Sequence, residues 1–162
     1  MILLSVGTQL PFDRLVSAVD SWALENPGVE VTAQIGPSRL QPRALHAFDF
    51  MRHDEFRQLQ AECSVMVSHA GMGSIITALE LGKPIIVFAR DHRLGEHRNG
   101  HQLATVAQFR QTPGVYVADD LNHLHDLLAC HAQLKPSSLA STQACPRIIE
   151  RLRGFVTDTF RP

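Results

Sequence analysis

The sequence has few cysteines, little net charge and no apolar run that approaches the roughly 20 residues needed to cross a membrane. Its formal charge is -1, from 15 basic and 16 acidic residues. It therefore lacks the basic surface typical of nucleic-acid-binding proteins, and we expect no nucleic-acid partner. The three cysteines, Cys63, Cys130 and Cys145, are an odd number without metal-ligand spacing. They favour reduced thiols in a cytosolic protein over disulfides.

The sequence also lacks internal repeats, low-complexity segments and a basic leader. Because residues 1–7 are apolar but short, we expect the first strand of the fold there rather than a signal peptide. Hydrophobic residues make up 44% of the chain and charged residues 19%, which is an ordinary globular composition. We therefore expect a single domain over residues 1–162, long enough to bury a core.

Short apolar runs and helical patterns alternate along the chain. The run at 2–6 is typical of a strand buried on both faces, and the apolar residues of 12–24 recur at helical spacing. This alternation predicts an α/β fold with an open, mostly parallel, Rossmann-like sheet and helices on both faces. The predicted strands are 2–6, 29–35, 48–51, 65–68, 85–89 and 115–117, and the predicted helices are 12–24, 54–62, 74–81, 99–109, 121–130 and 147–156.

A glycine-containing turn, His69-Ala70-Gly71-Met72-Gly73-Ser74, joins the predicted strand 65–68 to the next helix. α/β proteins bind phosphate groups at such a turn, because the free amides of the first helical turn and the helix dipole attract anions. Small residues also let a diphosphate approach the backbone. The sequence therefore predicts a nucleotide site here, although a tight turn without a ligand would use the same residues.

Two other nucleotide motifs and a metal site fit the chain poorly. The dinucleotide fingerprint needs glycine or alanine where this chain has Ile76, and it belongs to the first strand–helix unit. Segment 82–84 (Gly-Lys-Pro) precedes a strand and has no leading glycine at the spacing of a Walker loop. His97 and His101 lie four residues apart, but no cysteine or acid completes a ligand set. We expect no metal and no other cofactor.

Several motifs, taken in order, resemble the C-terminal domain of family 28 glycosyltransferases. They are the opening Val6-Gly7-Thr8 with Phe12-Asp13-Arg14-Leu15-Val16, the turn 69–74, Ala78-Leu79-Glu80-Leu81-Gly82-Lys83-Pro84, Glu96-His97-Arg98-Asn99 and His101-Gln102. The likeness covers nearly the whole chain. In length the chain is most similar to two kinds of single-domain subunit, namely those of two-component exopolysaccharide glycosyltransferases and the catalytic subunit of the dolichol-linked chitobiose synthase. The resemblance implies one half of a GT-B fold, a sugar-nucleotide-binding domain.

The resemblance also implies an activity and its partners. The chain would be the donor-binding catalytic subunit of an inverting glycosyltransferase, which transfers a hexose from a UDP-sugar to a lipid-linked saccharide acceptor in exopolysaccharide or capsule synthesis. A GT-B enzyme has two Rossmann-like domains and this chain has room for one. A separate membrane-anchored subunit would supply the acceptor site and the general base. It would also hold this cytoplasmic chain at the inner face of the plasma membrane.

Individual residues take their expected roles from the same resemblance. His69 would be the catalytic residue that stabilises the leaving nucleotide, although a histidine at this place can also be buried for packing. Many relatives hold the ribose with a glutamate at the position of Thr77, so Glu80 would either reach the ribose or pair with Lys83. The expected substrate-binding residues are Gly7, Thr8, Gly71, Met72, Gly73, Ser74, Thr77, Glu80, Arg90, Glu96, Asn99, His101 and Gln102.

Two other classes of function stay open on sequence grounds. A non-catalytic nucleotide-binding regulator would bind UDP without turnover even beside a partner. A stand-alone sugar-nucleotide hydrolase would turn over alone.

Overall fold

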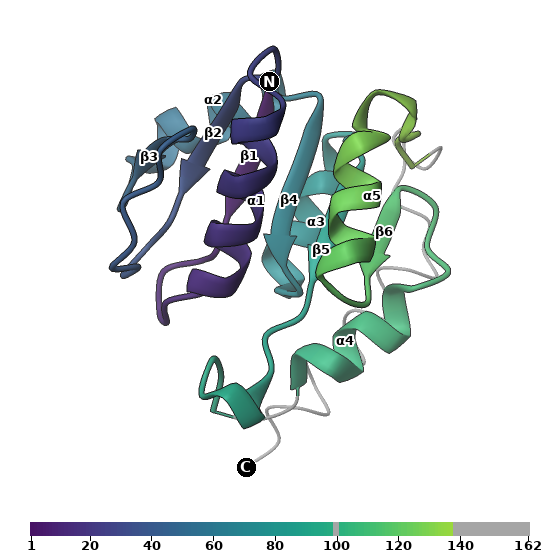
Figure 1. The fold of residues 1–162 in the computed structure, drawn as a ribbon. Helices are drawn as coiled ribbons and strands as arrows, with labels where there is room; N and C mark the ends of the chain where they lie inside the picture. The colour runs from purple at the N-terminus through teal and green to yellow at the C-terminus, as the bar shows by residue number, and fades with distance from the viewer. Residues whose placement is uncertain (99–100, 138–162) are drawn as a thin grey trace.

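Six short strands form one fully parallel sheet in the computed structural model, which describes residues 1–98 and 101–137 (Figure 1). The strands are β1 (Ile2–Ser5), β2 (Val31–Gln34), β3 (His46–Phe48), β4 (Val65–His69), β5 (Ile85–Phe88) and β6 (Val115–Ala118). Their order across the sheet is β3-β2-β1-β4-β5-β6, and every neighbouring pair is parallel. The predicted Rossmann-like architecture is confirmed.

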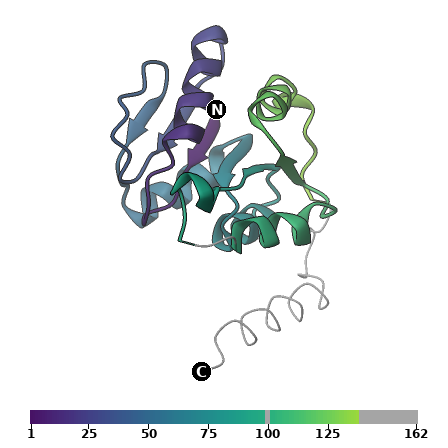
Figure 2. The same cartoon turned by 60° about the horizontal axis from the view of Figure 1, so that its bottom comes forward.

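Helices cover both faces of the sheet, as the sequence predicts. They are α1 (Asp13–Glu25), α2 (His53–Glu62), α3 (Met72–Glu80), α4 (His101–Phe109) and α5 (Leu121–Ala129), with short 3-10 turns η1 (His92–Leu94) and η2 (His131–Gln133). Helices α1 and α5 lie on one face, and α3 and α4 lie on the other (Figure 2).

The chain forms these elements because its apolar residues can be buried on both sides of the central strands. Every residue of β1, β2 and β5 is buried, as is typical of strands covered on both faces, although β2 also buries the polar side chains of Thr32 and Gln34. One core cluster contains Trp22 of α1 and Leu124 of α5. A second, on the opposite face, contains Ile75 of α3 and Phe109 of α4. In the described ranges no helix is long and apolar enough to cross a membrane.

The structure corrects several predicted boundaries. Strand β3 covers His46–Phe48 instead of 48–51. It is an edge strand whose residues are exposed or half-buried, so it has no apolar run to mark it. Helix α3 begins at Met72, two residues before the predicted start, because Gly73 belongs to its first turn rather than to the loop. The predicted helix 147–156 and the first residues of 99–109 lie outside the described residues.

The strand order places a crevice at one edge of the sheet. Strand β1 lies between β2 and β4, so the connections after β1 and β4 turn to opposite faces. Ser5 and Ser68, near the carboxyl ends of these two strands, are register partners. Ligands of open α/β proteins bind in the crevice outside such a switch point.

Candidate functional site

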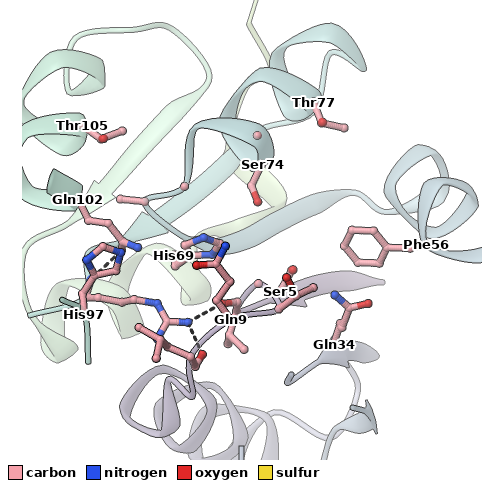
Figure 3. A pocket seen from close by; sticks show the side chains of 18 of the residues that line it. Ser5, Gln9, Gln34, Phe56, His69, Ser74, Thr77, His97, Gln102 and Thr105 are labelled. Carbon is pink, nitrogen blue, oxygen red and sulfur yellow. Dashed lines mark hydrogen bonds between the residues drawn. The ribbon is translucent and has the colours of Figure 1, made fainter. Parts of the chain in front are cut away.

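A cleft of about 720 Å³ lies at this switch point. It is lined by the loop after β1, the glycine turn after β4, the first turns of α3 and the start of α4. Figure 3 shows His69 in its middle, with His97 and Gln102 at one end and Phe56 and Gln34 at the other. The volume falls in the range of small-molecule and cofactor sites, about 300–1,000 Å³.

His69 is held between two glycines at the centre of the cleft. A Cβ added at Gly71 would lie 2.3 Å from Nε2 of His69, and one added at Gly7 would lie 2.9 Å from Cε1. Gly7 also has a φ of 81°, in the left-handed region that favours glycine. Both glycines are therefore needed to seat the imidazole ring, which fixes its place beside the α3 N-terminus.

The surroundings of His69 keep its ring neutral. Burial, followed by the charge of Arg90, lowers the pKa of His69 to about 4. The Ser68 hydroxyl donates to the Ser5 carbonyl at 2.8 Å, and its oxygen lies 3.3 Å from Nδ1 of His69. A neutral ring carries one hydrogen, on either nitrogen, and the tautomer with that hydrogen on Nε2 can donate to a group at the glycine turn.

The N-terminus of α3 offers uncommitted backbone donors to the cleft. Its N-cap, Gly71, makes no side-chain cap hydrogen bond, and the first turn contains no acidic residue. No described residue accepts a hydrogen bond from the amides of Met72, Gly73 or Ser74. An anion would satisfy these donors and would be stabilised by the helix dipole, which places about half a positive charge at this end.

Gly73 has no packing reason to be glycine. An added Cβ would meet nothing within 4 Å, and its φ is not in the left-handed region. Because Gly73 lines the cleft, the missing side chain leaves room for a group that approaches the α3 N-terminus from outside. A phosphate group can use such a space to reach the amides of a helix N-terminus.

Arg90 joins two walls of the cleft. It is 3% exposed, and its guanidinium donates to the carbonyls of Val6 (2.6 Å), Leu10 (2.7 Å) and Pro11 in the loop after β1. It also donates to the Glu96 carbonyl at 3.1 Å in the loop after β5. The sequence predicts a substrate contact for Arg90; the structure places its terminal nitrogens on backbone carbonyls instead.

Glu96 likewise binds protein groups. Its carboxylate accepts two hydrogen bonds from Arg14 of α1, at 2.8 and 2.7 Å, and one from the Asp91 amide at 2.8 Å. The Arg14 guanidinium stacks 4.3 Å from the ring centroid of Phe88. This pair fastens the loop after β5 to the start of α1, and Glu96 itself does not line the cleft.

Gln102 is oriented by a backbone amide. Its side chain is buried, and Oε1 accepts from the Arg90 amide at 3.0 Å. Since that bond identifies the oxygen, the other end of the amide is the NH₂ group, a donor that can face a ligand in the cleft.

The structure brings most of the predicted site residues together. Those that line the cleft are Gly7, Thr8, His69, Gly71, Gly73, Ser74, Thr77, Arg90, His101 and Gln102. Three do not line it: Met72, which packs against the second core cluster, Glu80, which is exposed at the end of α3, and Glu96. Asn99 lies outside the described residues.

The sequence left two roles open for Glu80, reaching the ribose or pairing with Lys83, and the described part of the chain shows no such pair. The Lys83 ammonium donates to the Cys63 carbonyl at 2.8 Å, and no ion pair joins it to Glu80. Thr77 lines the cleft one turn into α3, whereas Glu80 points to solvent at the helix end.

Sequence reasoning missed the far end of the cleft. Gln34, Met51 and Phe56 line it, and the Gln34 side chain accepts from the Met51 amide at 3.1 Å. Buried glutamine at the end of a predicted strand is the signal that could have indicated this wall, since a polar side chain there has to find a partner. Within residues 1–98 and 101–137 no group of three metal-ligating side chains occurs.

Comparison with known proteins decides the family. A model of the glycosyltransferase family 28 C-terminal domain matches residues 1–144. The chain belongs to this family. The predicted resemblance is therefore confirmed, and the cleft described above is that of a family 28 glycosyltransferase domain. A sequence comparison with curated proteins gave no significant match.

Solved structures share the fold of this family 28 domain. The NMR solution structure of ALG13 is 22% identical, with 93% of each chain covered and a TM-score of 0.63. The glycosyltransferase of kitacinnamycin is 20% identical (TM-score 0.61) and VinC, in complex with DTDP, is 17% identical (TM-score 0.53). The chain spans 37% and 32% of those two proteins, and it covers them with 94% and 80% of its own length.

Proposed function

We propose that this family 28 domain is the donor-binding catalytic subunit of a two-component inverting glycosyltransferase, which transfers a hexose from a UDP-sugar to a lipid-linked saccharide acceptor in exopolysaccharide or capsule synthesis. The observation that carries the proposal is the uncapped N-terminus of α3, which opens beside His69 into a cleft at the switch point of the sheet. It combines free amide donors, a glycine without a packing role and a neutral imidazole in one place.

The family resemblance favours one orientation of the donor in the cleft. The diphosphate would lie at the amides of Met72, Gly73 and Ser74, where the helix dipole attracts it. The hexose would lie toward Gln102, whose position typically contacts the donor sugar in this family, and the nucleoside would then extend toward Phe56 and Gln34 at the other end of the cleft. The choice of UDP follows the family resemblance.

The chemistry assigned to this chain is stabilisation of the leaving group. An acceptor hydroxyl oxygen forms a bond to the anomeric carbon from the face opposite the diphosphate, and the bond from that carbon to the phosphate oxygen breaks. The hydroxyl proton goes to a base on the partner, and the electron pair goes to the departing nucleoside diphosphate. The α3 amides, aided by His69, hold the charge that develops on the diphosphate.

The partner would be a membrane-anchored subunit that supplies the acceptor site and the base and holds this chain at the inner face of the plasma membrane. Large apolar side chains are exposed at the cleft edge of the sheet: Phe50, in the loop after β3, is 56% exposed, and Leu94, in η1, is 63% exposed. Exposed apolar side chains beside a site favour a second protein surface there.

Calorimetric titration of the full chain with UDP tests the donor site. The wild type should bind UDP saturably, and His69→Ala should weaken binding by about tenfold, the effect of losing one hydrogen bond to a charged group. His123→Ala, a change of a half-buried histidine in α5 outside the cleft, is the matched control and should bind as the wild type does. Equal affinities of wild type and His69→Ala would contradict the placement of the diphosphate beside His69.

A second measurement separates the proposed transferase from the two other functions. The chain is co-expressed with a candidate membrane-anchored partner, and hexose transfer to a lipid-linked acceptor is assayed with and without that partner. Transfer that needs both proteins supports the proposal. Release of free sugar by the chain alone would identify a hydrolase, and UDP binding without any turnover in the complex would identify a regulator.

A further inference from the structure

Arg90 is the one charged side chain that is buried among the described residues. A buried cation is costly unless hydrogen bonds and opposite charge offset its lost hydration. Here four backbone carbonyls accept from the guanidinium, and the ring of Phe12 lies 4.7 Å from it. These groups offset part of the cost through their dipoles and the aromatic face, but they carry no net charge.

No carboxylate forms an ion pair with Arg90 in the described ranges 1–98 and 101–137. Glu96 is near enough for its charge to act on the pKa of Arg90, but the carboxylate itself binds Arg14 and the Asp91 amide. Glu96 reaches Arg90 through its backbone carbonyl. The two charges of the Arg14–Glu96 pair offset each other, so the positive charge of Arg90 has no partner of its own.

This unpaired charge lies in a wall of the cleft. Arg90 lines it together with His69 and Ser74. The charge acts on neighbouring groups, since it is the largest cause after burial of the low pKa of His69. The terminal nitrogens of Arg90 have no hydrogen left for a direct bond to a ligand. Each of them carries two hydrogens and already donates to two carbonyls.

We propose that Arg90 is a positioning residue that also supplies charge: it holds the loop after β1 in place through three carbonyls, and its buried charge attracts the donor diphosphate without touching it. This inference rests on the proposed function. The sequence predicts direct contact between Arg90 and the substrate, whereas in this proposal Arg90 acts on the substrate indirectly in two ways. The loop is kept in the shape that seats His69 against Gly7, and the cleft is given positive potential that an anion neutralises.

A ligand series separates charge from positioning. Uridine, UMP and UDP are titrated into the wild type, Arg90→Gln and Arg90→Lys. Loss of the charge in Arg90→Gln should weaken UDP about tenfold, UMP less and uridine least, because the attraction grows with phosphate charge. Arg90→Lys keeps the charge and should show a smaller, more even loss. Equal losses for all three ligands in Arg90→Gln would overturn the electrostatic role, and unchanged affinities would overturn both roles.

Arg110→Gln is the matched control. Arg110 is exposed and paired with Asp119, at 2.5 Å between Nη2 and Oδ1, and it does not line the cleft. The substitution changes the net charge of the chain by the same amount as Arg90→Gln. A comparable graded loss in Arg110→Gln would mean that overall charge, rather than the buried arginine, attracts the diphosphate.

Titration of His69 by NMR gives a readout without any ligand. The charged and titratable groups that act on its ring are Arg90 and His97, so both histidines are followed in the same spectra. In Arg90→Gln the pKa of His69 should rise toward its usual value of 6.5, and in Arg110→Gln it should stay low. An unchanged pKa of His69 in Arg90→Gln would contradict the electrostatic role.

This titration also separates failure of the inference from failure of the proposed function. If the wild type binds no uridine nucleotide, the proposed function fails, and the His69 titration still decides whether the charge of Arg90 reaches the cleft. If Arg90→Gln does not fold, Arg90→Lys carries the test. The folded Lys variant should keep the low pKa of His69, and a return of that pKa to 6.5 with the charge retained would overturn the inference.

Discussion

Gly71 and His69 lie so close that a Cβ atom on the glycine would be 2.3 Å from Nε2 of the imidazole. Gly7 closes the other side of the ring, where an added Cβ would be 2.9 Å from Cε1. A methyl group on either glycine would therefore force the ring to shift from this position. In this family 28 domain Gly7 and Gly71 make room for the His69 ring, and Gly73 leaves space for a ligand.

Replacing Gly71 or Gly73 with alanine should have opposite effects on stability. Gly71→Ala should lower the free energy of unfolding by about 1–3 kcal/mol, the range for overpacking a tight site. Gly73→Ala should leave it unchanged or raise it by up to about 1 kcal/mol, because alanine favours a helix and no atom lies in the way. Both variants should bind UDP more weakly, since one displaces His69 and the other fills the approach to α3. Denaturant unfolding and calorimetry measure the two quantities, and normal UDP affinity in Gly73→Ala would contradict the phosphate position.

The low pKa of His69 makes stability depend on pH. The unfolded chain binds a proton at the usual pKa of 6.5, and the folded protein binds it at about 4. Between these values the unfolded state holds more protons, so stability is full above pH 6.5 and falls as the pH drops toward 4. The loss attributable to this group is up to about 3 kcal/mol. Unfolding of the wild type and His69→Gln at pH 7.5 and 4.5 measures it; the same pH dependence in both proteins would argue against a buried neutral His69.

The Arg14–Glu96 pair should contribute to stability as a coupled unit. The side chains are 27% and 12% exposed, and two hydrogen bonds join them. A double-mutant cycle with Arg14→Met and Glu96→Gln should give a coupling energy of about 1–3 kcal/mol. The glutamine oxygen can still accept from the Asp91 amide and from Nη2 of Arg14, so the cycle measures the loss of the charge and of the second hydrogen bond to Arg14. Additive losses from the two single substitutions would show that the pair does not fasten the loop.

Gln102→Glu should affect UDP-sugars more than UDP. The carboxylate can still accept from the Arg90 amide, as Oε1 of Gln102 does at 3.0 Å, but the NH₂ donor is lost. The preference for a UDP-sugar over UDP should fall by about threefold to tenfold, the value of one hydrogen bond. Calorimetry with UDP and with UDP-glucose, UDP-galactose, UDP-glucuronate and UDP-N-acetylglucosamine measures the ratio. An unchanged ratio for every sugar would place the hexose away from Gln102.

The sequence was sufficient to predict the sheet because the central strands are buried on both faces. The runs at 65–68 and 85–89 each mark a strand to within one residue, since a strand covered by helices on both sides can contain only apolar or paired polar groups. Edge strand β3 lacked that signal. Its Phe48 is 50% exposed, and the predicted strand 48–51 begins two residues after the start of β3 and ends three residues beyond its end.

The glycine turn was predictable because its function depends on residues close together in the sequence. Arg90 was not, since its partners Val6, Leu10 and Pro11 lie about 80 positions away. A sequence pattern can indicate a loop with charged residues, but the strand order decides which backbone carbonyls that loop meets. The same reason explains why Gln34 and Phe56 were missed: they reach the cleft only because β2 lies beside β1.

The parallel sheet has a practical consequence for spectroscopy. Every loop that lines the cleft leaves the carboxyl ends of the strands, so the loop that joins α1 to β2 lies at the opposite edge. Within that loop, Gly28 has no neighbour within 4 Å of an added Cβ and no left-handed φ. A fluorophore could be attached there through an introduced cysteine, on the side of the domain that no donor nucleotide is proposed to contact. Its anisotropy would report the tumbling of the domain and therefore its binding to a larger complex.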